Sequence, residues 1–136
     1  MGGNGWWYGY VCLPNCLSIY NKMIEATIIG NVPSKSNCYK VIPKGMIKSA
    51  ALKKYEELFF WQCGSIRDKN IDTPFEIELD VFYPSKRSDL DNSLKIILDC
   101  LQRTKTIKND NLCCKIVARK FIDKENPRII IKIETI

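Results

Sequence analysis

Hydrophobic and acidic residues alternate in part of this chain, and that period predicts strands. Residues 75–83, FEIELDVFY, carry an apolar residue at every second position, which is typical of a strand with one face in the core and one in solvent. Residues 24–29, IEATII, make an earlier extended run that ends at Gly30. Residues 38–42 are expected to form a short strand or extended segment.

Two other segments repeat their apolar residues at every third or fourth position, which predicts helices. Residues 48–63 form the first, with Ser49 as its N-cap. Its expected core stripe comprises Leu52, Tyr55, Leu58, Phe59 and Gln62. Residues 90–101 form the second helix. Its expected core stripe comprises Leu90, Leu94, Ile97, Leu98 and Leu101.

The end of the chain predicts two more strands. They cover residues 112–122 and 128–136, and residues 123–127 between them are expected to be a hairpin turn. The long elements then follow the order β-α-β-α-β-β. That order predicts an α+β fold in which a mixed sheet packs against two helices.

The length of 136 residues is that of one domain, but residues 1–22 differ from the rest. They hold four Gly, two Trp and three Tyr with a single charged residue, Lys22. We expect residues 23–136 to be the folded domain and residues 1–22 to be an extension. Two interpretations of the extension stay open. Either Met23 is the natural start, or the segment is an aromatic arm that stacks on bases or packs on a partner.

Composition narrows the class of function. The net charge of +6 favours a nucleic acid or another phosphate-bearing partner. Seven Cys without a secretory signal indicate reduced thiols and a cytoplasmic protein, and no apolar run is long enough for a transmembrane helix. The chain has no His, which excludes His-based triads and His-metal nuclease motifs. General-base chemistry is therefore left to carboxylates, Lys or metal-bound water.

Acidic residues gather where the second helix begins. Residues 88–99 read SDLDNSLKIILD, so Asp89 and Asp91 are two positions apart in extended chain and point to the same side. Two converging carboxylates without a soft ligand suit a hard cation, Mg²⁺ or Mn²⁺. Asp110, in the loop after the helix, is a candidate third ligand if that loop folds back.

A purely structural interpretation of the same acids also stays open. Asp89 could serve as the N-cap of the helix, and Asp91 could pair with Lys95 one turn later for a few tenths of a kcal/mol. Asp99 could be a second partner of Lys95. An Asn-Asp-Asn run around Asp110 is ordinary turn chemistry.

These residues resemble the RusA family of Holliday junction resolvases. That family carries Asp-x-Asp-Asn at the start of a helix, then a Lys, a helix acid and an acidic loop. The matching positions are Asp89, Asp91, Asn92, Lys95, Asp99 and Asp110. A Pro-x-x-x-Asn segment at residues 33–37 and a closing Ile-Glu-Thr at residues 133–135 match as well. The resemblance covers residues 23–136. The sequence departs from the family pattern at Ser88 and Asn109.

The resemblance implies a Mg²⁺-dependent endodeoxyribonuclease, with Mn²⁺ as an alternative ion, that resolves Holliday junctions by paired symmetric nicks. Its setting would be DNA recombination and repair, in a phage or prophage, and its active form a homodimer on four-way branched DNA. Asp89, Asp91 and Asp110 would hold the metal. Lys95 would offset charge that grows on the phosphate, and Asn92 and Asp99 would support the site.

A basic segment is the candidate DNA-binding surface. Residues 31–54 contain six Lys and no acid. A solvated face is the plain alternative to a track for DNA phosphates. The expected DNA contacts are Lys35, Asn37, Lys40, Lys44, Lys86 and Arg87. Trp61 is expected in the core or in an interface rather than on DNA.

Two rival functions stay open. A non-catalytic protein of the same fold could bind branched DNA without cleaving it. A metal-dependent phosphohydrolase could act on small substrates, but the chain has no Gly-rich phosphate-binding loop to hold them.

Overall fold

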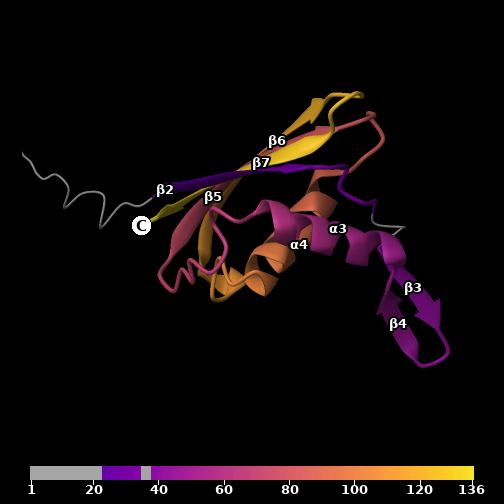
Figure 1. Cartoon of the computed structure of the whole chain (residues 1–136), viewed down its shortest axis with the longest axis horizontal. Coiled ribbons are helices and arrows are strands. Elements are labelled where there is room, and N and C mark those ends of the chain that lie inside the picture. The colour runs from indigo at the N-terminus through magenta and orange to yellow at the C-terminus, as the bar shows by residue number, and fades with distance from the viewer. Residues whose placement is uncertain (1–22, 35–37) are drawn as a thin grey trace, which may run out of the picture.

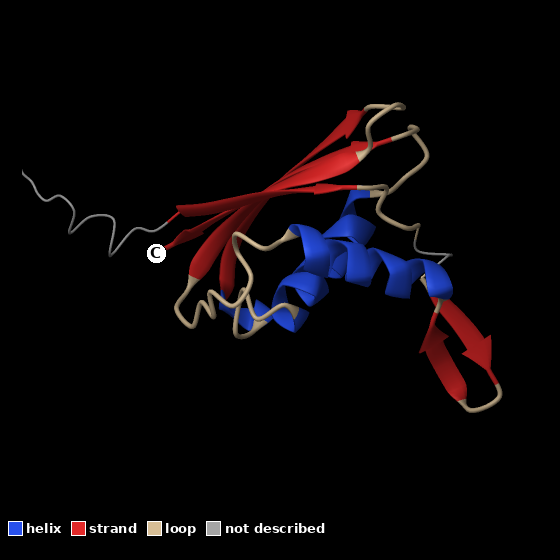
Figure 2. Ribbon diagram, in the orientation of Figure 1, coloured by secondary structure: helices blue, strands red, loops and turns tan. Residues whose placement is uncertain are grey.

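A computed structural model describes residues 23–34 and 38–136, and the fold is reported for these residues. A four-stranded sheet lies against two helices, and a small two-stranded hairpin projects from the helical side (Figures 1 and 2). Across the sheet the strands run in the order β2 (Met23–Ile29), β7 (Arg128–Thr135), β5 (Phe75–Tyr83) and β6 (Cys113–Ile122). The predicted α+β class, with a mixed sheet packed against two helices, is confirmed.

The predicted hairpin between the last two strands is wrong. β5 lies between β6 and β7, pairing parallel with β6 and antiparallel with β7. The turn at residues 123–127 reverses the chain but carries it past the end of β5, where the Asp123 N–H donates to the Tyr83 carbonyl at 2.8 Å. A turn signal predicts where a chain reverses, but it does not say which strand the returning chain pairs with.

The first helix is α3 (Ala50–Gln62), and its predicted features hold well. The Ser49 hydroxyl caps it by accepting from the Leu52 N–H at 3.2 Å. Leu52, Tyr55 and Phe59 are buried as expected. Trp61 is 71% exposed, which rules out the core for this residue and leaves the expected interface as a prediction.

The second helix is α4 (Leu90–Arg103), which connects β5 to its parallel neighbour β6. Its buried face is rotated from the predicted stripe. Ile97 and Leu101 are buried as expected, whereas Leu90, Leu94 and Leu98 are only partly buried. Ser93, Ile96 and Cys100 are the other buried residues of this helix.

The projecting hairpin consists of β3 (Tyr39–Ile42) and β4 (Gly45–Lys48). β3 matches the short strand expected at residues 38–42, but β4 was not predicted. A tight turn joins the two strands, and Gly45 has a φ of +136°, which residues with a side chain rarely adopt. No helix in the described part of the chain is long and apolar enough to cross a membrane.

Candidate active site

Asp89 and Asp91 lie at the N-terminal end of α4. Asp89 is the N-cap residue, with extended backbone, but its side chain makes no capping hydrogen bond. Asp91 lies in the first turn of the helix, and both residues are exposed. Both carboxylates are near the positive end of the helix dipole, which favours negative charge there. The N-cap interpretation therefore does not explain the Asp89 carboxylate.

The backbone before these acids is fixed by Tyr83 and Lys120. The Tyr83 hydroxyl donates to the Asp89 carbonyl at 3.0 Å and is also hydrogen-bonded to the Ser93 hydroxyl. Burial raises the pKa of the Tyr83 hydroxyl, so it stays protonated and can donate. From β6, the Lys120 Nζ donates to the carbonyls of Lys86 at 2.8 Å and Ser88 at 2.5 Å. The acidic end of α4 is thus held from two strands.

Sequence reasoning missed these two supporting roles. Tyr83 was expected only as the last core residue of its strand. A buried Tyr hydroxyl needs a hydrogen-bond partner, so a Tyr at the end of a strand just before a group of acids could have indicated this contact. Lys120 gave no signal, since its reach depends on β6 lying beside β5.

Asn92 connects the acidic site to the segment after β2. Its Nδ2 donates to the Pro33 carbonyl at 3.0 Å. A cavity of about 450 Å³ lies beside this bond, open to Asp89. Its lining comprises Val32, Pro33, Ser34, Tyr83, Arg87, Ser88, Asp89 and Asn92.

Lys95 and Asp99 follow one and two turns along α4. Within residues 23–34 and 38–136, neither Asp91 nor Asp99 forms an ion pair with Lys95. The helix-pair interpretation therefore does not account for them. Both side chains line a second cavity, of about 420 Å³, between α4 and the β3–β4 hairpin.

Asp110 lies at the other end of α4. It begins the short 3₁₀ helix η3 (Asp110–Leu112), and its N–H donates to the Gln102 Oε1 at 3.1 Å, near the C-terminus of α4. The helix has 14 residues and so extends about 21 Å from Asp89 to this point. No group of three or more potential metal-ligating side chains forms among the described residues of a single chain. Asp89 is extended but Asp91 is already helical, so the same-side geometry expected of extended chain does not apply to this pair, and α4 separates Asp110 from both.

The predicted basic contacts lie in two places, the loop before α4 and the projecting hairpin. Lys86 and Arg87 are exposed in the loop just before Asp89, and Lys40 and Lys44 are exposed on the hairpin. Lys35 and Asn37 lie outside the described residues.

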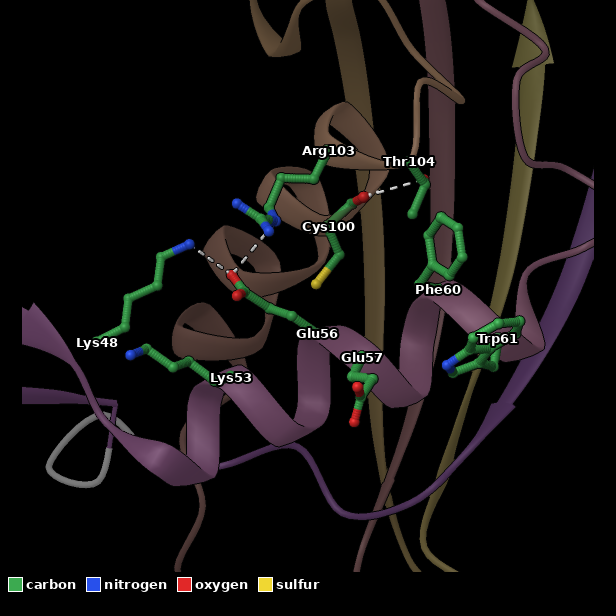
Figure 3. A pocket seen from close by; sticks show the side chains of 9 residues that line it. All are labelled: Lys48, Lys53, Glu56, Glu57, Phe60, Trp61, Cys100, Arg103 and Thr104. Atoms are coloured by element: carbon green, nitrogen blue, oxygen red, sulfur yellow. Dashed lines mark hydrogen bonds and ion pairs between the residues drawn. The ribbon is translucent and has the colours of Figure 1, made fainter.

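A wider cavity, of about 670 Å³, lies between α3 and α4 (Figure 3). Within it the Glu56 carboxylate accepts from Lys48 at 2.8 Å and lies 3.8 Å from Arg103. Trp61 and Phe60 lie at the opposite end of this cavity from Lys48 (Figure 3). None of the predicted acids of the active site lines it.

Replacing Tyr83 with Phe is expected to lower the free energy of unfolding by about 1–3 kcal/mol, because the buried Ser93 hydroxyl and the Asp89 carbonyl lose their partner. Urea denaturation followed by circular dichroism measures this change. Tyr39→Phe, on an exposed residue, is the matched control and should change stability by less than about 0.5 kcal/mol. Equal midpoints for the two variants would show that Tyr83 does not hold the loop.

Comparison with known proteins points to one family. The family model described as Endodeoxyribonuclease RusA matches residues 30–134. The Crossover junction endodeoxyribonuclease RusA of Aquifex aeolicus (strain VF5) is 32% identical over 103 residues, which cover 73% of this chain and 81% of that protein. The matched region includes β5, α4 and every candidate acid. The chain therefore belongs to the RusA family of endodeoxyribonucleases.

Proposed function

We propose that this protein is a Mg²⁺-dependent endodeoxyribonuclease that resolves Holliday junctions by paired symmetric nicks, in DNA recombination and repair. The observation that carries the proposal is the acidic end of α4. Asp89 occupies a capping position without capping, beside Asp91 in the same turn. Membership of the RusA family and the name of the Aquifex relative support the junction as substrate.

The donor set fits a hard divalent cation. Asp89 and Asp91 offer carboxylate oxygens, and no thiol or imidazole lines the cavity beside Asp89. Mg²⁺, or Mn²⁺ in its place, would be held by these two residues together with Asp110. When bound, such an ion polarises a phosphodiester oxygen and lowers the pKa of a bound water.

The chain's own residues would position and neutralise the phosphate. Lys95 lies one helical turn from Asp91, about 6 Å along the axis, and its ammonium has no carboxylate partner among the described residues. It is therefore available to offset charge that develops on the phosphoryl oxygens. Asn92 and the Tyr83 and Lys120 hydrogen bonds keep the acidic turn in place.

A second copy of the chain is proposed to supply Asp110, since α4 separates that residue from Asp89 and Asp91 within one chain. β6 supports this arrangement, because it is an edge strand of the sheet and none of its ten residues is buried. Two β6 strands paired antiparallel about a two-fold axis would bring the Cys113 end of one chain to the Ile122 end of the other. Asp110 precedes Cys113, and Lys120 contacts the loop before Asp89, so the acids of two chains would meet.

DNA phosphates are proposed to bind the exposed cations around this site, namely Lys40, Lys44, Lys86 and Arg87, with Lys35 and Asn37 as further expected contacts. Each phosphate contact releases counterions, so junction affinity should fall as salt rises.

Cleavage of a labelled synthetic four-way junction, compared with linear duplex in Mg²⁺ and in EDTA, tests the proposal. Symmetric nicks on the junction alone, and only with metal, are the expected result. Tight junction binding without cleavage in Mg²⁺ or Mn²⁺ would instead identify a non-catalytic branched-DNA binding protein. Cleavage that persists in EDTA would contradict the metal-dependent mechanism.

Replacing Lys95 with Ala is expected to slow junction cleavage by about 100-fold, because a preorganised positive charge is removed from the phosphate. Single-turnover rates measure the effect, and circular dichroism confirms the fold. Lys69→Ala removes an exposed Lys from the loop after α3 and should leave the rate unchanged. If both variants cleave at the wild-type rate, Lys95 has no role in the reaction.

A further inference from the structure

The cavity between α4 and the β3–β4 hairpin has a composition that phosphate binding does not explain. Its volume is about 420 Å³, within the range of small-molecule sites. Leu52 and Ile96, which are 4% and 7% exposed, provide an apolar floor. Tyr39 and Met46, which are 40% and 65% exposed, form its wall on the hairpin. Apolar walls of this kind suit a flat, uncharged group rather than a phosphate.

The polar rim of the cavity offers one uncommitted acid. Asp99 is partly buried, and its carboxylate has no hydrogen bond or ion pair with another described residue. Glu56 also lines the cavity, but its carboxylate already holds Lys48 and Arg103 (Figure 3). Asp99 is therefore the acid left to recognise a ligand, and a carboxylate can only accept hydrogen bonds.

The cavity lies next to the proposed catalytic site. Asn92 lines both this cavity and the one that opens to Asp89. Asp91, Lys95 and Asp99 follow one another at four-residue spacing, so each lies about 6 Å further along the same side of α4. A phosphate held near Asp91 and Lys95 would place its own nucleotide beside the mouth of the cavity.

We propose that this cavity holds one unstacked nucleobase of the strand being cleaved, and that Asp99 selects bases that carry an exocyclic amino group. The inference rests on the proposed function and adds a source of sequence preference to it. Stacking on Tyr39 and burial against the apolar floor would offset the cost of leaving the base stack. Cytosine, adenine and guanine each offer an amino donor to the carboxylate. Thymine offers one ring N–H between two carbonyl oxygens, which the carboxylate repels.

A junction library with randomised nucleotides around the cleavage points tests the selection. Wild-type protein is expected to cleave thymine at one of these positions about tenfold more slowly than cytosine. Asp99→Asn, whose amide both donates and accepts, should bring the ratio of the two rates close to one. Asp72→Asn, in the exposed loop before β5, is the matched control and should keep the wild-type profile. A uniform fall in rate at every sequence with Asp99→Asn would overturn the inference.

A binding measurement that needs no cleavage separates this inference from the proposed function. Junctions with an abasic nucleotide at the selected position should bind wild-type protein about tenfold more weakly in EDTA. Tyr39→Ala should bind the normal and the abasic junction equally. If instead Tyr39→Ala and Met46→Ser turn a dimer into a monomer in sedimentation, and the abasic junction binds normally, the hairpin contacts a second copy and the inference fails. A library that is not cleaved at all would contradict the proposed function alone.

Discussion

Asp91→Asn is expected to abolish cleavage of a four-way junction and to leave the junction bound. The substitution keeps the shape of the side chain but removes the charge that a divalent cation requires. Because a metal ion contributes several kcal/mol to stabilising the transition state, the single-turnover rate should fall by about 1,000-fold or more. Asp91 is exposed, so the fold should be unaffected.

Binding should be retained or tightened in this variant, because a negative charge is removed from a surface that faces DNA. Gel shifts in EDTA measure affinity, and denaturing gels measure nicking in Mg²⁺. Glu25→Gln removes an exposed charge from β2, at the sheet edge opposite β6, and should behave like the wild-type protein in both assays. Joint loss of binding and cleavage by Asp91→Asn would argue against a metal-ligand role, since it would mean that Asp91 supports the DNA-binding surface itself.

Mixing Asp91→Asn with Asp110→Asn, each expected to be inactive alone, should restore cleavage. In a mixed dimer, the Asp91→Asn chain supplies an intact Asp110 to the partner, and the partner supplies intact Asp89 and Asp91. Random exchange would leave about a quarter of all sites complete, with one in each mixed dimer. The product should therefore be a junction with a single nick, rather than two resolved duplexes.

The control for this experiment mixes Asp89→Asn with Asp91→Asn. Both changes lie at the same end of α4, so every site in a mixed dimer lacks one carboxylate and the mixture stays inactive. If the Asp91→Asn and Asp110→Asn mixture is also inactive after subunit exchange is verified, Asp110 does not act across the dimer. If Asp110→Asn alone cleaves normally, Asp110 is no ligand at all.

Local spacing was enough to predict the acidic end of α4. Asp89, Asp91 and Lys95 are within two helical turns, so their relative positions follow from helix geometry alone. The position of Asp110 could not be predicted from local spacing, because it depends on the end of the sheet at which β6 begins. Because β6 runs parallel to β5, its first residue returns to the start of β5 and not to the start of α4.

The helices and strands themselves were predicted more completely than the pairing of the strands. Alternation in residues 75–83 and the helical periods gave the type and position of each long element, since those signals are local. Strand pairing was missed because the turn at residues 123–127 has the same composition whether β7 pairs with β6 or with β5. The hydrogen bond from Lys120 to Ser88 was missed for the same reason, because it forms only when β6 lies beside β5.

The length of α4 has a consequence for the geometry of the product. In a two-fold pair, each proposed site would use the start of one α4 and the end of the other, so the two sites would be about one helix length apart. For 14 residues that separation is about 21 Å. The distance between the two nicked phosphates would thus be fixed by a rigid rod rather than by a flexible loop. The spacing of the two symmetric cuts would therefore depend on the number of turns in α4.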